Sequence, residues 1–184
     1  MTTIESTPDA GVTASSDHDT TTSSMLESIA GVFTSTDHKV TGRLYLAGGL
    51  LGLVATVVIN VLIGVERLDG VDTVLGSEIL PQLVDAQRIG LVFATLLPLA
   101  LAGCVAAVPL QLGARSIAFP RLASTGFWMW FGGAILTAVA LLNNGGTLGE
   151  DADAVALFIA GIGLMPVGLT ASAGSVATSI LTTR

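Results

Sequence analysis

The sequence has few charged side chains. Only 11% of its 184 residues are Asp, Glu, Lys or Arg, whereas soluble domains average about 25%. Because 51% of the residues are apolar, the low charge does not indicate disorder, since disordered chains are poor in apolar residues. The net charge of −7 excludes the basic surface that nucleic-acid binding needs. An integral membrane protein explains both the missing charge and the excess of apolar residues.

Ligands for metals are also scarce. The single cysteine, Cys104, excludes an intramolecular disulfide and a four-cysteine zinc site, and we interpret it as a small buried apolar residue rather than a thiolate ligand. The two histidines are His18 and His38, too few for a copper site of three imidazoles. His38 fits the start of a helix, with Thr36 or Asp37 as the N-cap. No HExxH, GxSxG or phosphate-binding loop occurs.

Four long apolar stretches dominate the rest of the chain. They are Leu44–Val65, Ile89–Leu112, about Phe127–Leu142 and about Val155–Leu181, and none contains Asp, Glu, Lys or Arg. About 20 residues cross a bilayer core as a helix, and the period-two alternation of a membrane barrel is absent. The sequence therefore predicts an all-α membrane protein, a bundle of four transmembrane helices over residues 37–184.

The residues before this bundle divide into two segments. Residues 1–24 are rich in Ser, Thr and Asp and predict a disordered acidic tail; no basic segment precedes an apolar core there, so they are not a signal peptide. In residues 25–36, apolar side chains recur at three- and four-residue steps. This spacing predicts a short amphipathic helix lying in the membrane interface.

The basic residues predict how the bundle is oriented. On one side of the predicted bundle lie Lys39, Arg43, Arg115, Arg121 and Arg184, and on the other lie Arg67 and Arg88. Because basic residues are enriched in cytoplasmic segments, we expect a multi-pass protein of the cell membrane with both termini in the cytoplasm.

Small residues four positions apart predict close helix packing. Such pairs are Gly48 and Gly52, Gly103 and Ala107, and Gly168 and Ser172. They indicate contacts between helices of one bundle or with other membrane subunits, without naming the partner.

Several segments of residues 33–184 resemble one family in the same order. Asp37, His38 and Lys39, followed by Gly42 and Leu44-Tyr45-Leu46, are similar to the start of the first helix of haem–copper oxidase subunit I. The run from Val108 to Leu122, VPLQLGARSIAFPRL, resembles the stretch after the second helix of that family. Phe127 and Trp128 resemble the start of its third helix, and TSILTTR at 178–184 resembles the end of its fourth.

The resemblance implies a subunit of about twelve helices that binds two haems and copper, reduces oxygen and pumps protons. This chain corresponds to the first four helices, whereas the copper ligands, the ligand of the high-spin haem and the second ligand of the low-spin haem belong to later ones. We therefore expect no cofactor in this chain alone, and haem and copper only if partner chains complete the site.

The positions that do correspond are altered. Gln87 stands where the family has the first low-spin-haem histidine, within Asp85, Ala86, Gln87 and Arg88 in place of Thr-Ala-His-Gly. Glutamine lacks the imidazole nitrogen that binds haem iron. Ser116 replaces the proton-entry aspartate, and a serine does not relay protons as a carboxylate does. Arg67 matches an arginine that contacts the low-spin haem in some members, so it is a candidate remnant contact; otherwise it is a helix-end charge paired with acids or lipid.

Three hypotheses follow from the resemblance and the substitutions. The first is a truncated, non-catalytic subunit I-like protein that serves as an accessory or structural subunit of an aerobic respiratory complex. The second is one piece of a split haem–copper oxidase that reduces oxygen together with partner chains, although Gln87 counts against it. The third is a small transporter or channel, which would need more polar side chains at mid-membrane than Asn60 and scattered Ser and Thr.

Overall fold

The computed structural model describes residues 31, 37–68, 79–113 and 117–182. It separates into two units, Met1–Ser35 and Thr36–Arg184. In the first unit only Gly31 is described, so the predicted tail at 1–24 and the predicted interfacial helix at 25–36 lie outside the described residues.

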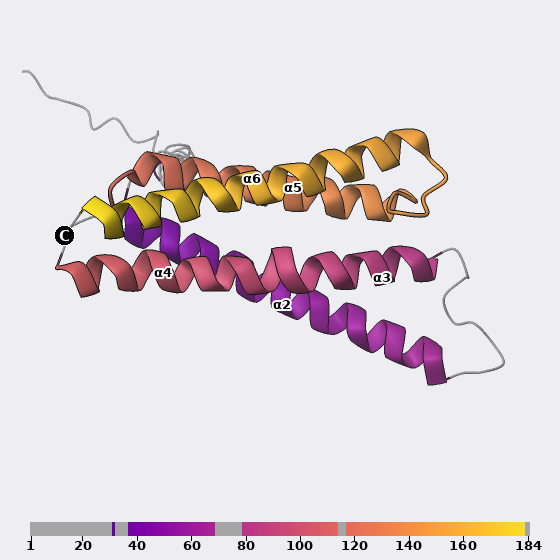
Figure 1. Cartoon of the computed structure of the whole chain (residues 1–184). Coiled ribbons are helices and arrows are strands. Elements are labelled where there is room, and N and C mark those ends of the chain that lie inside the picture. Colours follow the sequence, from indigo (N-terminus) through magenta and orange to yellow (C-terminus); the bar gives the residue numbers. More distant parts are fainter. Residues whose placement is uncertain (1–30, 32–36, 69–78, 114–116, 183–184) are drawn as a thin grey trace, which may run out of the picture. The chain divides into compact units, whose positions relative to one another are not determined.

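The second unit is a helical bundle (Figure 1). Its elements are α2 (His38–Leu68), α3 (Ile79–Ile89), the π-helical segment η1 (Gly90–Leu96), α4 (Leu97–Leu112), α5 (Pro120–Leu142) and α6 (Ala152–Thr182). Because α3, η1 and α4 form one continuous helix, the described residues contain four helices long and apolar enough to cross a membrane. The prediction of an all-α four-span bundle is confirmed.

Each helix begins before its apolar stretch, since the polar residues that precede the stretch are also helical. The second span starts at Ile79 rather than Ile89. The third span starts at Pro120 rather than at about Phe127. Proline suits the first helical turn, because an N–H at that position has no partner within the helix. Hydropathy therefore located the four long helices and underestimated their length.

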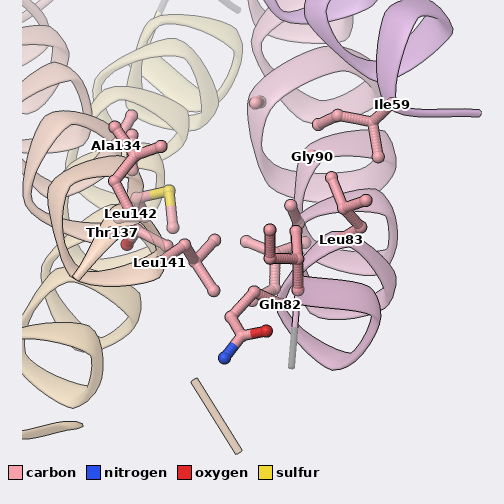
Figure 2. Close-up of a pocket in the computed structure, with 14 residues that line it drawn as sticks. Ile59, Gln82, Leu83, Gly90, Ala134, Thr137, Leu141 and Leu142 are labelled. Carbon is pink, nitrogen blue, oxygen red and sulfur yellow. The ribbon is translucent and has the colours of Figure 1, made fainter. Parts of the chain in front are cut away.

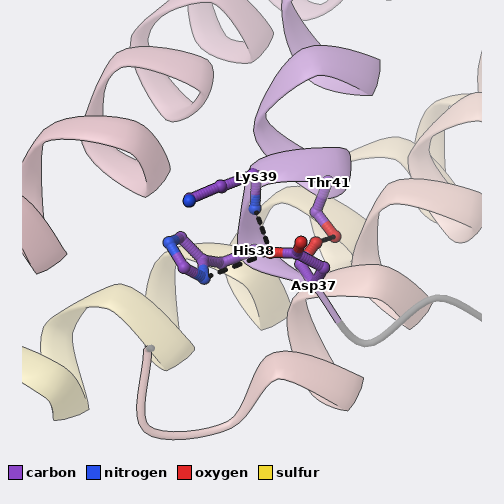
Figure 3. A network of polar contacts seen from close by, with 4 residues as sticks. All are labelled: Asp37, His38, Lys39 and Thr41. Carbon is purple, nitrogen blue, oxygen red and sulfur yellow. Dashed lines mark hydrogen bonds and ion pairs between the residues drawn. The ribbon is translucent and has the colours of Figure 1, made fainter. Parts of the chain in front are cut away.

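The N-terminus of α2 has a side-chain cap. The backbone N–H of Lys39 donates to Oδ1 of Asp37 at 3.0 Å (Figure 3). The carbonyl of Asp37 accepts from the N–H groups of Val40 and Thr41. This is the position and bond of an N-cap residue. The structure thus selects Asp37 from the two predicted candidates.

The bundle is organised as two helix pairs around an aromatic core. Helix α5 packs along α6, while α2 packs along η1 and α4 and diverges from α3 toward its C-terminal end (Figure 1). Between the pairs lie the buried rings of Tyr45, Phe127 and Trp130, with centroids 5.1 to 5.6 Å apart. The hydroxyl of Tyr45 is 2.6 Å from the Oγ of Ser172, so α2 and α6 are joined across the core.

Two of the three predicted small-residue pairs lie in helix contacts. A Cβ added at Gly48 would come within 2.7 Å of the Trp130 ring, and one added at Gly168 would collide with the backbone of α5. At Gly103 nothing lies within 4 Å of an added Cβ, so the third pair makes no helix contact at this residue inside the described bundle, and a contact with another membrane subunit stays a prediction. The neighbouring Cys104 is likewise exposed on the bundle surface rather than buried.

Candidate functional site

The second span changes its hydrogen-bond pattern in the middle of the bundle. In η1 the N–H of Leu97 bonds to the carbonyl of Val92, one residue further back than in an α-helix. The carbonyl of Phe93 would next bond to residue 98, which is a proline without an N–H. The indole Nε1 of Trp130 donates to this carbonyl instead, at 2.7 Å. Trp130 therefore satisfies a backbone group that the π segment leaves open.

Gln87 lies one turn before this π segment, and its amide faces α2. Its Nε2 donates to Oδ1 of Asn60 at 2.5 Å, and Nδ2 of Asn60 donates to the carbonyl of Thr56 at 2.8 Å. The hydroxyl of Thr56 is 3.4 Å from that of Thr95. The side chain at the expected haem-ligand position is thus part of a polar chain that links α2 to the second span.

This chain of amides and hydroxyls does not fit a haem iron. The amide nitrogen of Gln87 has no lone pair available for a metal, and it donates its hydrogen bond to Asn60. The amide oxygen of Gln87 is a weak ligand for iron compared with imidazole. Arg88 follows it with an exposed cationic side chain.

Of the other two candidate residues, the structure describes only Arg67, which is not brought to Gln87. Arg67 is exposed in the last turn of α2, seven residues after Asn60 and so about 10 Å further along the helix axis. There its charge complements the negative end of the helix dipole. Ser116, at the expected proton-entry position, lies outside the described residues.

Sequence reasoning missed the role of Asp85. Its side chain is 8% exposed and its Oδ2 accepts both the N–H and the hydroxyl of Thr147, each at 2.8 Å. A Cβ at the adjacent Gly146, whose φ is +112°, would come within 3.0 Å of the same oxygen. Asp85 therefore fastens the loop between α5 and α6 onto α3, a contact that a linear acidic pattern does not reveal.

A tight turn at the end of α5 makes this contact feasible. Asn144 adopts a positive φ of 56°, and the N–H of Gly145 bonds to the carbonyl of Ala140 at 2.8 Å. This is the 6→1 bond that ends a helix in a Schellman motif. The reversed chain places Oδ1 of Asn144 where Nε2 of Gln82 donates to it, so α3 is tied to the loop at a second point.

A cavity of about 350 Å³ lies between α3 and the α5–α6 pair (Figure 2). Its walls are almost entirely aliphatic, and Gln82 and Thr137 are its polar side chains. Gln87 does not line it. Met165 supplies a thioether, but this side chain is 1% exposed and belongs to the hydrophobic core. Within the described ranges no three His, Cys, Asp or Glu residues gather closely enough to hold a metal.

Fold and site together define a multi-pass membrane protein. Its first two spans are linked by a polar centre, which consists of Gln87, Asn60, Thr56 and Thr95. The family described as "Cytochrome C and Quinol oxidase polypeptide I" matches residues 40–184. The chain belongs to this family, which confirms the resemblance read from the sequence. As the relatives are bacterial oxidase subunits and four spans are present, it is a multi-pass protein of the plasma membrane.

Individual relatives match part of the chain. Cytochrome c oxidase subunit 1 of Bacillus sp. (strain PS3) is 36% identical over 106 residues, covering 55% of this chain and 17% of the relative. The same subunit of Bacillus subtilis (strain 168) is 34% identical over 103 residues, 55% of this chain and 16% of the relative. The probable quinol oxidase subunit 1 of Staphylococcus haemolyticus is 29% identical over 113 residues, 61% of this chain and 17% of the relative. The match thus spans less than a fifth of each relative's length.

Proposed function

We propose that this subunit I-like chain acts as a non-catalytic accessory or structural subunit of an aerobic respiratory membrane complex. The observation that carries the proposal is the side chain of Gln87, which replaces an iron ligand of the family and donates to Asn60. A helix-to-helix hydrogen bond stands where the family has a haem contact. The scaffold is kept while the position that would hold the cofactor has become structural.

The outer surface of α2 supports a role in assembly. Its large apolar side chains are exposed along the whole helix, including Leu51 at 67% and Val54 at 61%. In a bilayer this surface meets lipid, and in a complex it meets neighbouring helices. Family membership favours other membrane subunits as partners of the chain.

The orientation belongs to the same proposal. Both termini lie in the cytoplasm, because Lys39, Arg43 and Arg121 lie at one end of the bundle and Arg67 and Arg88 at the other. A Cys104→Ser background with single cysteines at positions 150 or 37 tests it with a membrane-impermeant maleimide on intact cells. Labelling at 150 alone is expected; labelling at 37 alone would reverse the orientation.

Co-purification tests the assembly role. A tagged full chain is extracted from its native membrane in mild detergent, and the complex is identified by native electrophoresis and mass spectrometry. We expect stoichiometric respiratory subunits and unchanged oxygen reduction per complex in a Gln87→Leu variant that still assembles. A loss of oxygen reduction in an assembled Gln87→Leu complex would instead assign the chain to the catalytic unit, as in a divided oxidase.

A further inference from the structure

A second cavity, of about 440 Å³, lies between the start of α2 and the face of α4 that runs from Leu99 to Leu110. One end of it is basic: His38 and the cationic Lys39 and Arg43 line it there. The rest is aliphatic, with Leu46 on α2 and Leu99 among the lining residues of α4. We call this cavity the basic groove. It combines charge at the membrane surface with an apolar floor inside the membrane.

An acid, Asp37, stands beside these basic residues in the sequence. The carboxylate of Asp37 caps the helix through the backbone N–H of Lys39 and lies 3.5 Å from Nδ1 of His38 (Figure 3). The side chains of Lys39 and Arg43 are both exposed and stand four residues apart, on one face of the helix. Two cations thus face outward at the mouth of the groove.

The apolar floor has the length of one leaflet. Its residues on α4 run from Leu99 to Leu110, eleven residues or about 16 Å along a helix. Half of a ~30 Å hydrocarbon core is about 15 Å. Between these leucines the groove is lined by the small residues Gly103 and Ala106. Their small size leaves room for an extended chain against the helix backbone.

We propose that the basic groove binds an anionic glycerophospholipid. The phosphodiester pairs with Lys39 and Arg43, and one acyl chain lies along Leu46 and the small residues of α4. Basic pockets between membrane helices recognise anionic headgroups in this way, and arginine adds a forked donor for phosphate oxygens. Charge selects the headgroup, and the groove adds apolar contact that a dissolved anion cannot make.

Charge removal tests the headgroup contact. The purified full chain in mild detergent is titrated with phosphatidylglycerol, with phosphatidylcholine of the same acyl chains and with inorganic phosphate, and lipid adducts are counted by native mass spectrometry. The Lys39→Gln/Arg43→Gln variant should bind phosphatidylglycerol about 30-fold more weakly, as expected for two basic residues near an anionic headgroup. The control Arg88→Gln/Arg121→Gln removes the same charge from exposed positions outside the groove and should bind like the wild type.

Filling the groove tests the acyl contact independently. Gly103 has nothing within 4 Å of an added Cβ, and the same is true of Gly163 on α6. Gly103→Leu should therefore fold and lose the phosphatidylglycerol adduct, whereas the matched Gly163→Leu should keep it. Ala106→Leu serves as a second variant if Gly103→Leu does not fold.

Four outcomes overturn the proposal. If phosphatidylcholine binds as well as phosphatidylglycerol, the charge of the headgroup has no role. If inorganic phosphate binds as well as phosphatidylglycerol, the acyl chain has no role. Equal losses in the two charge variants reduce the effect to net charge. Unchanged adducts in both Gly103→Leu and Ala106→Leu place the lipid elsewhere on the bundle.

Discussion

The bond from Trp130 to the Phe93 carbonyl gives the sharpest test of the bundle's energetics. Trp130→Phe removes the donor and leaves a buried carbonyl unsatisfied, which costs about 1–3 kcal/mol, in addition to the packing lost from a ring that is 2% exposed. Pro98→Ala restores a backbone N–H next to the same carbonyl. In that background the Phe93 carbonyl has a second donor, so Trp130→Phe should cost about 1 kcal/mol less than in the wild type.

The measurement is a double-mutant cycle of unfolding free energies. The wild type, both single variants and the double variant are unfolded reversibly with SDS in mixed micelles, and helix content is followed by circular dichroism. The packing loss at Trp130 is present in both backgrounds and cancels. If Trp130→Phe lowers the unfolding free energy equally with proline or alanine at position 98, the indole of Trp130 does not stabilise the bundle by satisfying the Phe93 carbonyl.

Three further predictions concern the loop, the small residues and the polar centre. Asp85→Leu strands two donors of Thr147 and should cost about 1–3 kcal/mol, with faster hydrogen exchange in residues 143–151; unchanged exchange would refute the loop contact. Gly168→Leu should prevent stable packing of α5 on α6. The control Gly174→Leu, at a glycine with nothing within 4 Å of an added Cβ, should melt within a few degrees of the wild type. Equal melting temperatures of the two variants would contradict the packing at Gly168. Gln87→Leu should cost about 0.6 kcal/mol, the average for hydrogen bonds between membrane helices, in the same SDS assay, and a gain in stability would show that the pair with Asn60 is not favourable.

The four spans could be predicted because membrane insertion depends on length and hydropathy, which are properties of each segment alone. Val155–Leu181 needs no knowledge of its neighbours to be recognised as a helix in lipid. The helix ends were harder, because residues 79–88 are polar enough to read as a loop and become helical as a continuation of the span.

The family could be recognised from its linear motifs, and Gln87 could be identified as the altered position. Its partner could not, because Asn60 lies 27 residues away on another helix. The same reason hid the contact of Asp85 with Thr147, which are 62 residues apart. Polar partners across helices depend on rotation and register, which a hydropathy pattern leaves open.

The wrong prediction that Cys104 is buried has a related cause. Gly103 and Cys104 occupy an apolar run that is equally compatible with lipid-facing and buried positions, since both environments favour small apolar residues. Burial inside a membrane bundle therefore cannot be read from apolarity, whereas in a water-soluble helix the polar face marks the outside. The π segment was missed because Pro98 alone does not say which carbonyl it leaves unpaired.

We infer that Gln87 has a structural role, and the haem content of the purified chain distinguishes this role from haem binding. The full chain, taken from its native membrane and separated from co-purifying subunits, is examined by visible absorption of the reduced and oxidised protein. We expect far less than one haem per chain, both in the wild type and in Gln87→Leu. One haem per chain in the wild type that is lost in Gln87→Leu would contradict the account.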